Sequence, residues 1–176
     1  MKQMLSMCHH VKRTYFPGWD DTNEWHVQLK ARLSDGFLGD AYCNRKKKTI
    51  EISRTFNANN DDEWCCLLAH LLSHAISGAE HNHEWIVRLL AIARQAEISG
   101  RQALADLIRD DIAISQDAKH ANLIPILQNI ESAVADQPNA SFETIVEFAA
   151  GAWVKDVNEL VKQYGAVRKY YDVLKA

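Results

Sequence analysis

The chain has 176 residues, of which 47% are hydrophobic, and a formal net charge of −3 at pH 7. This length fits one domain or one domain with an appendage. The composition excludes a disordered chain and a protein built mainly to coat nucleic acid. The sequence contains no membrane-spanning apolar stretch, no signal-peptide core near Met1, and no disulfide or C-x-x-C pattern among its four cysteines. These features predict a protein of the reducing cytoplasm.

Three short segments in the first third of the chain have the pattern of β-strands, namely 25–33, 37–43 and 48–53. Ser34–Gly36 is a turn signal, and Arg45–Lys48 gives the second connection a basic run. Short connections between consecutive strands are typical of an antiparallel meander. We therefore predict an α+β fold with a small antiparallel three-stranded sheet. The basic run is either a solvated hairpin tip or a phosphate contact.

A helix with two histidines is predicted to follow the strands and to pack on the sheet. His70 and His74 are four residues apart in an apolar run whose helical face comprises Trp64, Leu67, Leu68, Leu71 and Ala75. Polar residues at 57–62 can cap its start, and Gly78 is expected to end it. A second helix is predicted from about Asn82 to Glu97.

Beyond residue 100 the pattern is helical throughout, which predicts a helical C-terminal region, 100–176, after a first domain, 1–99. Pro125 must start, kink or end one of its helices. Three short helices are expected near 141–150, 154–164 and 166–174. Residues 141–176 thus resemble a helix-turn-helix in outline, and a plain helical cap on the sheet fits the pattern equally.

The histidines between residues 70 and 83 have the spacing of metal ligands. Two imidazoles at i and i+4 can bind one ion from one side of a helix, and a zinc hydrolase adds a third ligand and keeps one position for water. Gly78 permits the chain to turn back, so either His81 or His83 can supply the third ligand, and normally only one of them would bind. This interpretation makes Zn2+ the cofactor. Surface or interface histidines without a metal are the alternative.

An ordered set of motifs runs through residues 25–95, and it consists of Leu38–Cys43, Thr49–Ser53, Leu68–Ala75 and His81–Trp85. In this order the motifs resemble those of the SprT-like zinc metallopeptidases, a family of the zincin group. That family has a glycine- and cysteine-containing strand, a strand ending in Ile-x-Ile/Leu-Ser, an H-E-x-x-H helix and a downstream H-G-x-x-F/W. The resemblance implies three zinc ligands and one aromatic neighbour, which are His70, His74, His81 and Trp85.

The chain departs from this family in two respects. Position 71 is Leu, where the family has the glutamate that acts as general base on the zinc-bound water. Loss of a general acid–base typically lowers the rate by about 10²–10⁴-fold. Glu80 and Glu84 are the candidate substitutes, because they flank the third ligand. The second departure is the helical tail, which stands where the family has a cysteine-rich zinc ribbon.

Three functions fit these residues. The first is a SprT-like zinc-binding protein with lost or weak peptidase activity, which binds a protein or peptide in the former substrate groove. The second is an active metallopeptidase with a displaced base, and the third is an interaction module with a structural zinc or no metal. Because relatives in this family act at chromosomes, the resemblance also implies proximity to DNA, although the net charge does not favour strong non-specific DNA binding. No membrane partner is expected.

Overall fold

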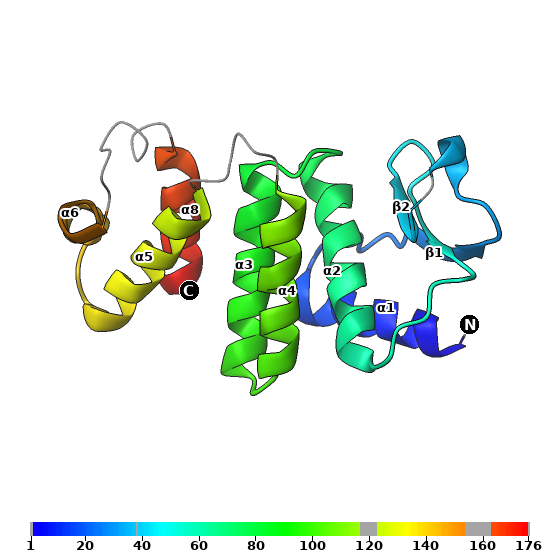
Figure 1. Ribbon diagram of the computed structural model, residues 1–176, viewed down its shortest axis with the longest axis horizontal. Helices are drawn as coiled ribbons and strands as arrows, with labels where there is room; N and C mark the ends of the chain where they lie inside the picture. The colour runs from blue at the N-terminus through cyan, green and yellow to red at the C-terminus, as the bar shows by residue number, and fades with distance from the viewer. Residues whose placement is uncertain (1, 38, 117–122, 154–162, 176) are drawn as a thin grey trace.

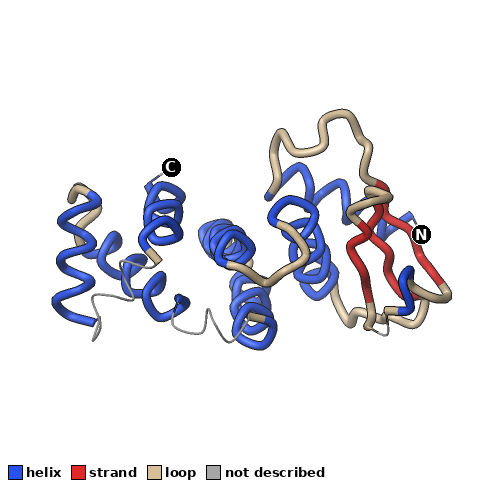
Figure 2. The backbone as a smooth tube through the Cα atoms, turned by 90° about the horizontal axis from the view of Figure 1, so that it is seen from above, coloured by secondary structure: helices blue, strands red, loops and turns tan. Residues whose placement is uncertain are grey.

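The structure, a computed structural model, describes residues 2–37, 39–116, 123–153 and 163–175. Its elements in chain order are α1 (Lys2–Tyr15), β1 (His26–Lys30), the short 3-10 helix η1 (Ser34–Gly36), β2 (Ala41–Asn44), β3 (Thr49–Ser53), α2 (Asp61–Ser77), α3 (His83–Ile98), α4 (Gln102–Ser115), α5 (Leu123–Asp136), α6 (Phe142–Trp153) and α8 (Tyr164–Lys175). The sheet lies at one end of the molecule, α2, α3 and α4 lie in the middle, and α5, α6 and α8 lie at the other end (Figures 1 and 2). The predicted α+β class is confirmed.

The sheet is mixed, so the prediction of an antiparallel meander is wrong. The strand order is β1-β3-β2, with β1 parallel to β3 and β2 antiparallel to β3. The tight basic turn makes β2 and β3 a hairpin, as expected. The longer connection between β1 and β2 crosses the end of β3, so β1 and β2 pair with opposite edges of β3. The alternating pattern of β1 predicts a strand but does not specify its partner.

A buried carboxylate fixes this crossing connection. Glu51 of the central strand is only 1% exposed. Its two oxygens accept hydrogen bonds from the backbone N–H and the hydroxyl of Ser34, both at 2.7 Å. A buried carboxylate needs such donors, because loss of its hydration would otherwise destabilise the fold. The turn at η1 is therefore tied directly to the middle of the sheet.

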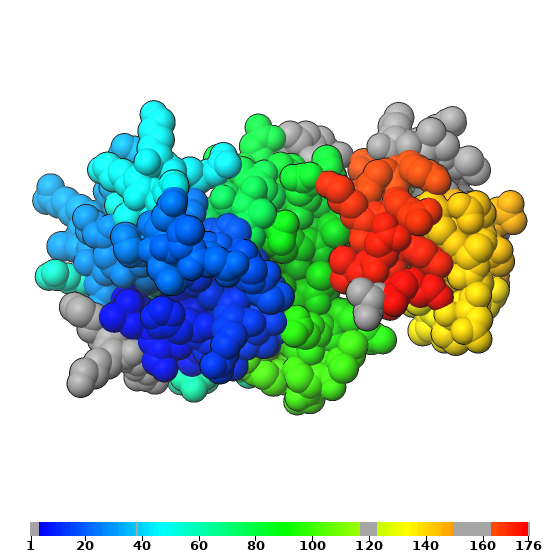
Figure 3. All heavy atoms as spheres, turned by 180° about the vertical axis from the view of Figure 1, so that it is seen from behind, coloured from blue at the N-terminus to red at the C-terminus, as the bar shows by residue number. Residues whose placement is uncertain are grey.

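The N-terminal helix α1 was not expected from the sequence. Its buried side chains, Met4, Cys8, Val11 and Tyr15, recur at helical spacing and belong to the main core. Figure 3 shows α1 and α8 on the rear face of the molecule, with part of α3 visible between them. The core thus receives a helix from each end of the chain.

The two central helices begin and end where their capping residues predict. Asn60 caps α2 by accepting a hydrogen bond from the N–H of Glu63, and Gly78 follows the last residue of the helix. Asn82 caps α3 by accepting from the N–H groups of Glu84 and Trp85. The predicted histidine helix and its successor are both confirmed.

The C-terminal helices agree with the expected helical region. Pro125 lies in the first turn of α5, where a missing N–H is tolerated. The helix expected to stop at Gly151 extends to Trp153 as α6. Most of the helix expected at 154–164 lies outside the described residues, so the helix-turn-helix outline stays a prediction. Each helix within the described part of the chain is too short or too polar to cross a bilayer.

Candidate metal centre

Three histidines converge at the C-terminal end of α2. His70 and His74 lie one turn apart on that helix, and the chain then reverses at Gly78 so that His81 returns to them. The distances between the Nε2 atoms are 3.2 Å for His70 and His74, 3.1 Å for His74 and His81, and 3.4 Å for His70 and His81. The structure thus brings together the three residues that the sequence predicted as ligands, and these residues can hold a metal ion.

The hydrogen bonds of the Nδ1 atoms fix the ring orientation of two of these histidines. The Nδ1 of His70 lies 2.7 Å from the Oδ2 of Asp111, and the Nδ1 of His74 lies 2.9 Å from the carbonyl oxygen of Gly78. Both partners are acceptors, so each Nδ1 carries a proton and donates it. In the neutral rings the Nε2 lone pairs then face each other, which is repulsive unless a cation lies between them.

The spacing of the three nitrogens fits a small divalent metal ion. A tetrahedral zinc with Zn–N bonds of about 2.05 Å places its nitrogens about 3.3 Å apart, and the three observed distances lie on both sides of that value. Imidazole nitrogen suits zinc, copper, iron and nickel. The geometry therefore supports a metal site with three protein ligands but does not by itself select the element.

Burial keeps the central ligand in the neutral form that a metal requires. The His74 side chain is buried, which lowers its pKa from 6.5 to about 4. The hydrogen bond to Gly78 raises the pKa, and the charges of His70 and His81 lower it. Near pH 7 His74 is therefore neutral, with its proton on Nδ1 and a lone pair on Nε2 that a metal ion can bind.

The indole ring of Trp85 packs against all three imidazoles. It is fully buried, and its ring centroid lies 4.9 Å from that of His70, 5.7 Å from His74 and 4.5 Å from His81. Its indole N–H also donates to the carbonyl oxygen of His70 at 3.4 Å. The residue matched to the family's aromatic position thus packs directly on the ligand set and restricts ring rotation.

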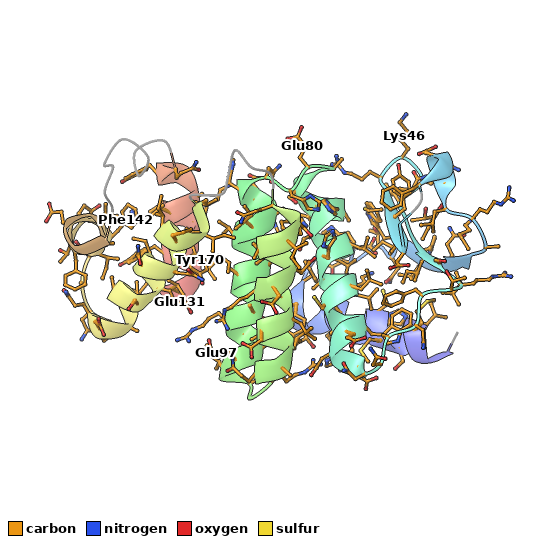
Figure 4. All side chains as sticks on the ribbon, viewed as in Figure 1. Lys46, Glu80, Glu97, Glu131, Phe142 and Tyr170 are labelled. Atoms are coloured by element: carbon orange, nitrogen blue, oxygen red, sulfur yellow. The ribbon has the colours of Figure 1, made fainter. Side chains whose placement is uncertain are left out.

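Leu71 and the candidate substitutes for the missing glutamate lie apart from the group of ligand atoms. Leu71 is 4% exposed and belongs to the hydrophobic core. Glu84 is exposed and pairs with Lys169 of α8 at 2.6 Å, and this hydrogen bond lowers its pKa. Glu80 is exposed on the connection between α2 and α3 and points outward in Figure 4. His83, the alternate ligand, is the first residue of α3, and the cluster is formed without it.

Asp111 is the site residue that the sequence analysis missed. It lies on α4, within a region to which the sequence assigned no role, and it contacts His70 across 41 positions of the chain. The spacing of Asp111 carries no signal for this contact, because it lies on a half-exposed part of an amphipathic helix. In comparison with known proteins, no family model, curated protein or solved structure matches the chain.

Proposed function

We propose that this chain is a SprT-like, zinc-binding protein whose peptidase activity is lost or weak, and that it binds a protein or peptide next to its metal. The observation that carries the proposal is the combination of three converging Nε2 atoms with a buried Leu71 at the neighbouring position. The first supports a zincin-like ion site. The second leaves the usual position of the general base without a carboxylate.

The residues present would hold zinc with His70, His74 and His81 as ligands, in the arrangement of catalytic zinc sites that have three protein ligands. Bound zinc supplies Lewis acidity and lowers the pKa of a bound water toward neutrality. The chain itself orients the imidazoles through Asp111 and the carbonyl of Gly78, and it shields them with Trp85. These parts support metal binding but do not move a proton.

The positions of the two glutamates disfavour a displaced base. Glu84 is held by Lys169, and Glu80 points away from the molecule. Hydrolysis of a peptide needs a group that accepts the water proton and delivers one to the leaving amine, a contribution of about 10²–10⁴-fold. The binding function is therefore better supported than an active metallopeptidase.

The edge strand β2 is the candidate surface for an extended peptide. β2 pairs only with β3 inside the described sheet, and it packs against α2. An edge strand offers unpaired backbone groups that a peptide can bind by strand addition. Arg45, at the tip of the same hairpin, approaches Gly78 at the end of the histidine helix. A peptide along β2 would thus lie beside the metal ligands.

Metal content measured by mass spectrometry tests the zinc site. We expect about one zinc per chain in the wild type and in His83→Ala, and none in His74→Ala. His83→Ala is the matched control, since it removes a nearby histidine that lies outside the cluster. Absence of metal from the wild type would refute the proposed site.

A hydrolysis assay separates the binding protein from an active peptidase. We expect no chelator-sensitive cleavage of an unfolded protein by the zinc-loaded wild type. Cleavage that a chelator abolishes, and that Glu84→Gln or Glu80→Gln also abolishes, would identify a displaced base and contradict the loss of activity.

A further inference from the structure

A carboxylate from α4 reaches the metal cluster from a helix that carries no ligand. The Oδ2 of Asp111 lies 2.7 Å from the Nδ1 of His70, and neither side chain is strongly exposed, at 25% and 19%. A distance this short is typical of a charge-assisted hydrogen bond. Asp111 thus interacts with the ring atom opposite to the one that faces the other imidazoles.

The orientation of this carboxylate is itself fixed. The hydroxyl of Ser115, one turn further along α4, donates to the Oδ1 of Asp111 at 3.1 Å. The same helix buries Leu104, Ala105, Ile108 and Ile112 completely, and it packs on both α2 and α3. Asp111 therefore stands on a rigid element, and each of its two oxygens has a different donor.

We propose that Asp111 is a positioning residue that holds the His70 ring in its Nδ1–H tautomer with Nε2 directed at the metal. This inference rests on the proposed zinc site. The role of Asp111 makes α4 part of the metal centre. A carboxylate on the outer nitrogen of a ligating histidine increases the basicity of the ring and fixes its rotation. Loss of such a partner typically weakens metal binding by about 10–100-fold.

The other histidine of α2 is oriented without α4. The Nδ1 of His74 donates to the carbonyl of Gly78, which belongs to the turn that follows the same helix. Removal of the Asp111 carboxylate should therefore affect His70 and leave His74 in place. The expected result is a weakened site with altered geometry rather than a loss of the whole cluster.

The experiment compares Asp111→Ala and Asp111→Asn with Asp110→Asn in the full chain. Asp110 is the exposed neighbour of Asp111, so its variant changes the charge equally without touching His70. The readouts are zinc affinity by competition with a chromophoric chelator, the absorption spectrum of the cobalt-loaded protein, and the His70 tautomer by nitrogen NMR. Asp111→Ala should weaken zinc binding by about 10–100-fold and shift the cobalt spectrum, whereas Asp110→Asn should match the wild type. Asp111→Asn keeps an acceptor without the charge and should fall between them.

Equal affinities and tautomers in Asp111→Ala and Asp110→Asn would overturn the inference. It would also be overturned if the affinity loss were matched by a loss of folding in metal-free Asp111→Ala, because Asp111 would then be structural. A wild type that binds no metal would instead refute the proposed function, so the two failures are distinguishable.

Discussion

At the scale of single residues, Leu71 occupies the position at which the proposed zincin-like site lacks a general base. It follows the first ligand, His70, and it is buried in the core that α2 shares with the sheet and α1. A carboxylate at this position would have to leave that core or be buried in it. Leu71 therefore contributes to the packing of the core, at the position where the proposed zincin-like site would need a proton acceptor.

Leu71→Glu tests this separation. We expect the zinc-loaded variant to cleave an unfolded protein at least about 100-fold faster than the wild type, because it regains a carboxylate beside the first ligand. We also expect a lower free energy of unfolding, by a few (about 2–4) kcal/mol, since a polar group replaces a buried leucine. Leu71→Gln is the control, with similar size and no basic carboxylate. Equal cleavage rates in the two variants would contradict the assignment of this position.

Burial also sets the reactivity of the four thiols. It raises the pKa of Cys8 and of Cys43 to about 11 and that of Cys66 to about 12, and it raises the pKa of Cys65. At pH 8 a thiol with a pKa near 11 is a thiolate in about one molecule in a thousand.

We therefore expect all four cysteines to alkylate slowly in the native protein at pH 8 and rapidly in denaturant, as measured by mass spectrometry with iodoacetamide. The raised folded-state pKa values also mean that the thiol contribution to stability is complete below pH 9.0 and is lost as the pH rises through 11. Urea midpoints should fall over that interval. Rapid native labelling of one cysteine at pH 8 would show that its site is not desolvated.

At the scale of elements, the turn at Gly78 links the end of α2 to His81, the third member of the histidine cluster. Gly78 has φ 111° and ψ −178°, a backbone conformation essentially limited to glycine. Its N–H donates to the carbonyl of His74, and its own carbonyl accepts from the imidazole of the same residue. One unusual backbone conformation thus both ends the helix and orients a ligand.

We expect Gly78→Ala to lower the free energy of unfolding by about 1–3 kcal/mol, because alanine is strained at this φ. Urea unfolding measures the change. Gly165→Ala is the matched control, since Gly165 lies exposed in the first turn of α8 with open space around it. Alanine favours a helix, so the control should be neutral or more stable by up to about 1 kcal/mol. A Gly78→Ala variant as stable as the wild type would show that the turn tolerates other residues.

Local patterns predict these elements well where the signal lies in neighbouring residues. Asn60, Gly78 and Asn82 mark the limits of α2 and α3 because capping is decided within one turn. The parallel pairing of β1 with β3 has no such local signal, since it depends on the path of the chain past η1. The clustering of His70, His74 and His81 was predictable because they lie within one short stretch, whereas the contact of Asp111 depends on how α4 packs against α2.

At the scale of the whole molecule, the C-terminal helices share the hydrophobic core of the central ones, since α8 packs on α3, and polar contacts add to this packing. The hydroxyl of Tyr170 donates to Glu131 at 3.0 Å, and Glu131 also lies 3.7 Å from Arg94 of α3 (Figure 4). Lys169 of α8 pairs with Glu84 at the start of α3. Residues near the turn between α2 and α3 are thus connected to the C-terminal helices through α3.

The basic hairpin tip offers few cations for a contact with DNA. The exposed basic run Arg45–Lys48 lies at the tip of the β2–β3 hairpin, where Lys46 points outward (Figure 4), and Lys48 already pairs with Glu24. The three remaining cations of this run can neutralise three phosphates at most. We therefore expect a contact of this tip alone with duplex DNA to be weak, with a log–log salt slope no steeper than about −2.7. Fluorescence anisotropy between 50 and 200 mM salt checks this, and Lys46→Glu should reduce binding if the tip makes the contact. A markedly steeper slope would reveal a larger basic surface.

The closeness of the three proposed ligands in the chain also has a consequence for the denatured state. His70, His74 and His81 fall within one short segment, so the proposed zinc site predicts that an unfolded chain also chelates the ion with them. Asp111, far along the sequence, contributes only after α4 has docked. Zinc should therefore raise the melting temperature by less than its native affinity implies. The metal can also bind early during refolding and bring the two arms of the α2–α3 turn together before the rest of the molecule is formed.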